Sequence, residues 1–203
     1  MNIKTLFPGL AAIFLAVAFP AYWVPEFAVG VDHIESSIWS NVSTLNLHDL
    51  LFVTISLMAA YICYALMQKL HDELNYKKID PLLWILIGTN ILFTATIIVD
   101  ITASALGMEW AIQNKDILIG TATAVSLGCT IVFGVTDIII GVMLLRSGDS
   151  TPTILKIFGA VTVLQGICEF IFVFVFAVVF IYPVSLILLA IFFIRTPETI
   201  EVV

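Results

Sequence analysis

The sequence predicts an all-α, polytopic transmembrane bundle of six helices, with the N- and C-termini both in the cytoplasm. Three observations lead to this prediction. Hydrophobic residues make up 61% of the 203 residues and charged residues only 11%, against about 25% in a soluble domain. A run of 38 residues from Ile157 to Ile194 contains a single charge, Glu169. Seven of the eight basic residues fall on one side of a six-helix count.

We expect one transmembrane domain over residues 1–203. As a single helix, the run from Ile157 to Ile194 would extend roughly 57 Å, nearly twice the ~30 Å hydrocarbon core of a bilayer, so it is divided into two spans. The other spans are apolar runs of bilayer length between polar segments. The predicted helices cover residues 6–24, 47–68, 82–106, 117–145, 154–174 and 177–195.

The first span has two interpretations. Lys4, the apolar run after it and the small residues at Ala16-Val17-Ala18 have the form of a cleaved signal peptide over residues 1–18. Apolar sequence continues past this site to Val24, however, and about 20 apolar residues are enough to span a bilayer. We therefore favour a retained helix.

Two connections differ in how clearly the sequence marks them. Residues 25–46 carry Pro, Gly and Ser and are predicted to form an external loop, in which Asn41-Val42-Ser43 matches a glycosylation acceptor. The turn between the last two helices contains no Gly, Asn or Asp. We expect this turn near residues 174–178, with Pro183 as an early kink in the sixth helix.

The charge distribution predicts orientation, location and partners. Basic residues concentrate on the cytoplasmic side of polytopic membrane proteins. We expect a cell-membrane protein whose main partner is the lipid bilayer, with a bacterial inner membrane as the default for so short a chain. The net charge of −7 and the lack of a basic patch argue against nucleic-acid binding. The inner basic residues are Lys4, Lys69, Lys77, Lys78, Arg146, Lys156 and Arg195, and Lys115 lies on the other side.

Small and polar residues recur on one face of the third, fourth and fifth predicted helices, and each of these faces carries one acid. We expect the three faces to turn toward one another. Their small and hydroxyl residues are typical of close helix packing, whereas a carboxylate inside a membrane needs a proton, water, a cation or a partner. The faces carry Thr89, Thr96, Asp100 and Ser104; Thr123, Ser126, Thr130, Gly134, Asp137 and Gly141; and Thr162, Gln165 and Glu169.

Depth along the helices divides the candidate site residues into two groups. His48, Asp49, Asp100 and Glu169 are expected in the outer third, while Asp137 is expected apart from them, nearer the cytoplasm. The outer group admits three interpretations: a water-filled vestibule, a site that binds or translocates a proton, a cation or a small polar ligand, or a catalytic metal or acid/base site. The supporting polar residues are Gln165, Thr162, Thr96 and Thr130.

No motif in the sequence supports enzyme chemistry. Histidine pairs with metal-ligand spacing, the Gly-x-Ser-x-Gly elbow, phosphate loops and Cys-x-x-Cys pairs are all missing. We therefore expect no metal and no cofactor, and we disfavour an enzyme without excluding an intramembrane one. The main alternative to a proton or ligand site is a structural or assembly subunit, as a homo-oligomer or within a larger membrane complex.

Glu169 is the most distinctive of these residues. Burial disfavours its charged form, so we expect it to be largely protonated at neutral pH. We also expect Asp100 to be its nearest ionisable neighbour, nearer than His48.

Overall fold

The computed structural model describes residues 3–28, 45, 47–148, 151–171 and 174–195. Within these residues, six helices are long and apolar enough to cross a membrane, which confirms the predicted number. The predicted external loop and its Asn41-Val42-Ser43 triplet lie almost entirely outside the described residues. The helices are α1 (Ile3–Ala28), α3 (Leu47–Leu74), α4 (Asp80–Thr94), α5 (Ile97–Leu106), α6 (Met108–Gln113), α7 (Lys115–Leu145), α8 (Thr153–Phe170) and α9 (Val175–Ile194).

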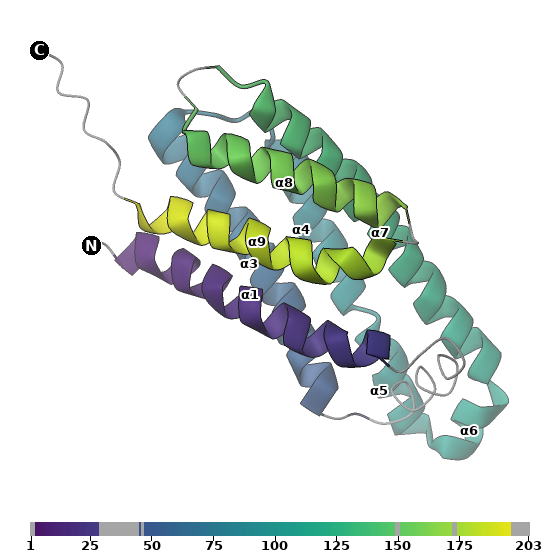
Figure 1. The fold of residues 1–203 in the computed structure, drawn as a ribbon. Helices are drawn as coiled ribbons and strands as arrows, with labels where there is room; N and C mark the ends of the chain where they lie inside the picture. The colour runs from purple at the N-terminus through teal and green to yellow at the C-terminus, as the bar shows by residue number, and fades with distance from the viewer. Residues whose placement is uncertain (1–2, 29–44, 46, 149–150, 172–173, 196–203) are drawn as a thin grey trace, which may run out of the picture.

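The long helices form a closed ring. Each packs against the next along the chain in the order α1, α3, α4, α7, α8 and α9, and α9 packs back against α1. The start of α1 and the end of α9 lie at the same end of the bundle (Figure 1), where a Cβ added at Gly9 would lie 2.6 Å from Cγ1 of Ile194. We call this end the N/C end and the opposite end the far end. The side of a membrane on which the N/C end lies stays a prediction, as does retention of the first helix.

Packing is densest toward the N/C end. The fully buried large side chains come mostly from the halves of the helices that lie there, among them Leu70, Leu83, Leu155, Phe192 and Phe193. At the far end, α5, α6 and the first turns of α7 extend beyond α1 and α9 (Figure 1). A small separate cluster of Ala103, Ala111 and Leu118 joins these three helices. The bundle is therefore a packed core at one end and a looser, less covered structure at the other.

The third span is broken between α4 and α5. The side-chain hydroxyl of Thr96 donates to the backbone oxygen of Phe93 at 2.7 Å, and the backbone N–H of Thr96 bonds the same oxygen at 3.2 Å. The N–H groups of Ile98 and Val99 likewise bond carbonyls three residues earlier. A side-chain hydroxyl that competes for backbone groups favours such a local change from the α-helical pattern. The uniform third helix predicted from hydropathy is therefore two helices in line.

The predicted position of the last turn is wrong by a few residues. α8 ends at Phe170, Ile171 adopts an extended backbone with φ −95° and ψ 90°, and α9 has begun by Val175. The surrounding sequence is a uniform run of Ile, Phe and Val, so no side chain marks the boundary. Pro183 lies inside α9, as predicted.

α7 and α8 approach so closely that their backbones touch through two glycine pairs. A Cβ added at Gly141 would lie 2.4 Å from the backbone oxygen of Gly159, and one added at Gly166 would lie 2.5 Å from that of Gly134. Real Cβ atoms do not approach a backbone atom so closely. Small residues at such positions are the usual means by which helices pack closely in lipid.

We predict that Gly141→Ala and Gly166→Ala each destabilise the protein by about 1–3 kcal/mol, because α7 and α8 must separate to admit the methyl group. The measurement is thermal unfolding in detergent. Gly88→Ala in α4 is the control, since nothing lies within 4 Å of a Cβ at that position, and it should be neutral or slightly stabilising. Equal melting temperatures for all three variants would contradict the close approach of α7 and α8.

Candidate functional site

A buried polar cluster connects α7, α8 and α9 in the middle of the bundle. Its members are Asp137 on α7, Gln165 and Glu169 on α8, and Ser185 on α9, all of them buried. Gln165 is at the centre: its side-chain nitrogen Nε2 donates to Oδ2 of Asp137 at 2.8 Å and to Oε1 of Glu169 at 3.0 Å. The hydroxyl of Ser185 donates to Oε1 of Gln165 at 3.2 Å. One amide therefore binds two carboxyl groups and one hydroxyl.

The glycine pairs bring these side chains together. Their antiparallel register places Glu169 about six residues, roughly 9 Å, from Asp137 along the helix axis, with Gln165 between them. A Cβ added at Gly134 would lie 3.2 Å from Cβ of Glu169, so the stem of Glu169 passes directly over this glycine. The lack of a side chain at Gly134 is thus what leaves room for the cluster.

The prediction that Asp137 stands apart from Glu169 is wrong, and side-chain direction explains the error. The backbone positions predicted for Asp137 and Glu169 along the bundle are close to the observed offset of roughly 9 Å. Helical side chains, however, tilt toward the N-terminus of their own helix. α7 and α8 are antiparallel, so Asp137 tilts toward the far end, Glu169 tilts toward the N/C end, and the two meet at Gln165.

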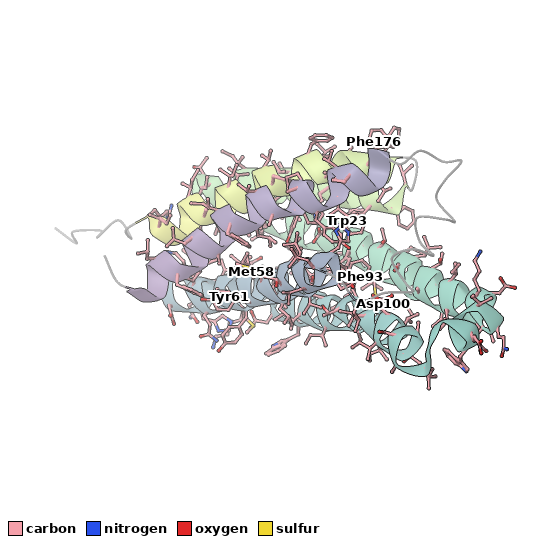
Figure 2. All side chains as sticks on the ribbon, turned by 90° about the horizontal axis from the view of Figure 1, so that it is seen from below. Trp23, Met58, Tyr61, Phe93, Asp100 and Phe176 are labelled. Carbon is pink, nitrogen blue, oxygen red and sulfur yellow. The ribbon has the colours of Figure 1, made fainter. Side chains whose placement is uncertain are left out.

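Asp100 is not part of this cluster. The tighter backbone at the α4–α5 break turns about 120° per residue in place of 100°, which moves Asp100 off the face that carries Thr89. Asp100 is half-buried and lies close enough to Asp49 for the two carboxylates to interact. Figure 2 shows Asp100 beyond Phe93, toward the far end. The expectation that Asp100 is the nearest ionisable neighbour of Glu169 is therefore wrong, because that neighbour is Asp137.

His48, Asp49 and Asp100 lie at the far end, whereas Glu169 belongs to the Gln165 cluster, so the predicted grouping of these four residues is wrong for Glu169. His48 and Asp49 lie in the first turn of α3, and the His48 ring stacks on Tyr22 of α1 with centroids 4.0 Å apart and an interplanar angle of 18°. Asp49 is buried. We call these three residues the far-end group.

The predicted supporting residues divide between local and shared roles. Thr96 and Thr130 donate to carbonyls of their own helices, those of Phe93 and Ser126, and Thr162 donates to that of Phe158. Gln165 alone among the four connects different helices. Sequence reasoning missed Ser185, for which the only signal is a hydroxyl within an otherwise apolar stretch of α9.

A small cavity of about 60 Å³ adjoins the cluster. Asp137, Gln165, Thr162 and Ser185 supply part of its wall, and apolar residues of α3, α4, α8 and α9 supply most of the rest. A cavity of this kind needs about 10–15 Å³ to admit a water molecule, which also requires polar partners. The cavity therefore has room for water on the side that Asp137, Gln165, Thr162 and Ser185 line.

No cation pairs with the cluster within the described residues. Lys69 is a buried cation within a helix, because α3 extends past its predicted end at residue 68 to Leu74. Its ammonium nitrogen lies 2.8 Å from Oε1 of Glu73 and donates to the backbone oxygen of Phe193 at 3.0 Å. Phe193 is eight residues, roughly 12 Å, along α9 from Ser185. Lys69 is therefore bound elsewhere and does not neutralise Asp137 or Glu169.

We predict that Gln165→Leu lowers stability by several kcal/mol, because it leaves Asp137, Glu169 and Ser185 without their shared partner, at about 1–3 kcal/mol for each stranded group. Glu169→Gln should remain near wild type, since it has the size of a protonated Glu and keeps an acceptor for Gln165. Melting temperature in detergent checks both, with exposed Gln68→Leu as the matched control. If Glu169→Gln unfolds the protein while Glu169→Asp does not, Glu169 is an ionised structural partner.

Comparison of the chain with protein-family models, with curated proteins and with solved structures gives no match. What the protein does must therefore be inferred from the chemistry of its own residues.

Proposed function

We propose that this is a multi-pass membrane protein that binds a proton at the Asp137–Glu169 pair, as the central site of proton-linked transport or sensing. The hydropathy and length of six helices support the membrane location. The clustering of basic residues toward the N/C end supports a cytoplasmic position for that end. The far-end group then faces outward.

The observation that carries the proposal is that two buried carboxyl groups share one neutral amide, and no cation among the described residues pairs with them. A buried ionised carboxylate without a counter-charge is so costly that the group takes up a proton in its place. Two such groups beside each other resist ionising together even more strongly. A proton on one acid removes the repulsion between two carboxylates, and the two N–H bonds of Gln165 then hold both side chains in place.

The chemistry of the cluster favours a proton over a metal ion. Within the described residues, no three His, Cys, Asp or Glu side chains are grouped so that they could hold a metal. Oε2 of Glu169 is buried and has no hydrogen-bond partner. If Glu169 carries its proton on Oε2, that oxygen belongs to a neutral O–H group. The free energy of burying such a group is far smaller than that of burying a charged carboxylate oxygen.

The proposal also requires a route to the pair, and an aromatic layer lies across the route from the far end. Phe52, Phe93 and Phe133 come from α3, α4 and α7, with ring centroids 5.1 Å apart between Phe52 and Phe93 and 6.3 Å between Phe93 and Phe133. In sequence, Phe52 and Phe93 lie between the far-end group and the cavity-lining residues of α3 and α4, and Phe133 precedes Asp137 on α7, on its far-end side. We propose that they separate an outer proton-exchanging group from the inner acid pair.

We predict that Asp137→Asn and Glu169→Gln each abolish proton uptake by the protein. The infrared band of a protonated carboxylic acid, followed as a function of pH in the purified protein, should lose intensity in either variant. In liposomes, an internal pH-sensitive dye should report proton entry that depends on Glu169 and that Phe93→Ala accelerates. Asp116→Asn, at an exposed position at the start of α7, is the control and should leave both signals unchanged. An unchanged carboxylic-acid band in Glu169→Gln and Asp137→Asn would exclude the proton site.

One specific observation favours the alternative function, a subunit of a larger assembly. The far-end half of α7 exposes Gly120, Ala124 and Gly128 at four-residue spacing, and nothing lies within 4 Å of a Cβ built at either glycine. Small residues at this spacing are typical of helix association in membranes. In this alternative the far half of α7 packs against a helix of another chain.

We predict for this alternative that Gly128→Leu abolishes co-purification of a partner or of a second copy from native membranes. Gly88→Leu is the control, because Gly88 is equally open but has no small residue four positions away. Blue-native electrophoresis after mild solubilisation is the measurement. A single monomer-sized band for wild type and both variants would count against the assembly role.

A further inference from the structure

Two loops at the N/C end enclose a hollow of about 430 Å³ that has no role in the proposed proton site. One wall follows the end of α3, and the other is formed by the end of α7 and the described residues that follow it, up to Gly148, together with Thr151. Its polar lining consists of Tyr76, Lys78, Arg146, Ser147 and Thr151. This volume falls within the range of small-molecule sites, about 300–1,000 Å³.

The two walls are held in place by local structure. Asn75 has a positive φ of 47°, which Asn tolerates well, and the N–H groups of Asn75 and Tyr76 bond carbonyls in the last turns of α3. The Tyr76 hydroxyl then reaches across the hollow to the backbone oxygen of Met143 on α7 at 3.4 Å. Burial raises the pKa of Tyr76, so this hydroxyl stays neutral and keeps its proton for the bond.

The lining is chemically suited to an anion. Lys78 and Arg146 contribute two cations from opposite walls, and both are exposed. Thr151 is buried in the wall and adds a hydroxyl. No carboxylate of the described residues lines the hollow. A planar Arg fork together with a Lys point charge is a usual combination for binding phosphate.

The hollow also continues into apolar surface. Val142 lines it and is 38% exposed, and Leu145, three residues further along α7, is 44% exposed. Exposed apolar side chains on a membrane-spanning helix face lipid chains. A phosphate held between Lys78 and Arg146 would thus lie where polar headgroups meet the hydrocarbon region, and basic pockets between helices at this level bind anionic lipid headgroups.

We propose that this hollow binds the phosphate group of an anion at the membrane surface, with an anionic phospholipid as its source. The site is independent of the acid pair, so it stands or falls separately from the proposed proton chemistry. Lys77 provides an internal comparison: it is the sequence neighbour of Lys78, carries the same charge and is exposed, but it does not line the hollow.

The experiment is native mass spectrometry of the full chain, released from detergent with phosphatidylglycerol or phosphatidylcholine. Wild type should retain phosphatidylglycerol in preference to phosphatidylcholine. Lys78→Gln and Arg146→Gln should each weaken retention about tenfold, as expected for the loss of one charge-assisted contact, while Lys77→Gln should change it less than about twofold. Arg146→Lys keeps the charge but loses the fork, and it should also weaken retention. All these positions are exposed, and unchanged melting temperatures would show that the variants fold.

The source of the phosphate is tested by competition with inorganic phosphate. If millimolar phosphate displaces phosphatidylglycerol from wild type but not from Arg146→Gln, the hollow recognises the phosphate group alone and accepts soluble ligands as well. If it does not displace the lipid, the acyl chains contribute along α7. Equal losses for Lys77→Gln and Lys78→Gln would mean diffuse charge attraction and would overturn the site, as would equal retention of the two lipids.

Discussion

The close approach of α7 and α8 is the constraint on which the rest of the structure depends. At Gly134, Gly141, Gly159 and Gly166 the two backbones are in contact, and no larger residue fits there without moving one of the helices. This contact brings an acid of one helix within hydrogen-bond distance of an amide on the other. Gly134 also leaves the space that the Glu169 side chain occupies, since a Cβ at Gly134 would lie 3.2 Å from Cβ of Glu169. The position of the polar cluster therefore depends on where the glycines lie as well as on its polar side chains.

The cluster in turn explains why the ring closes as it does. A polar group in the middle of an apolar bundle must be surrounded by partners, since lipid offers none. Ser185 supplies the contact from α9, so the same amide that binds α7 also fixes the position of the last helix. α9 then carries this constraint to α1, against which it packs along its length. Among the described residues, the far half of α7 makes no such polar contact with a neighbouring helix and is largely exposed.

Hydropathy and helical periodicity were sufficient to predict the six spans and the inward faces of Asp137, Gln165 and Glu169, because both signals are repeated over many residues. Features set by single residues were not predictable. Ser185 is one hydroxyl in an apolar run, and the turn after Phe170 has no distinctive side chain. The position of Asp100 was predicted wrongly because the backbone N–H groups of Thr96, Ile98 and Val99 bond carbonyls three residues earlier, which changes the helical phase in a way that sequence spacing does not encode.

The two ends of the bundle differ in what separates the acid pair from solvent, and this difference favours one direction of proton exchange. Toward the N/C end lie fully buried Phe192 and Phe193 and the charged contacts of Lys69, whose hydrogen bonds are worth about 1.5–3 kcal/mol each. Toward the far end the barrier is three half-buried rings whose mutual contacts contribute only about 0.5–1.5 kcal/mol per pair. Side-chain rotation of one ring is a smaller rearrangement than breaking the Lys69 contacts. On the proposed function, the pair therefore exchanges its proton with the side that carries His48, Asp49 and Asp100, and a conformational change is needed to reach the other.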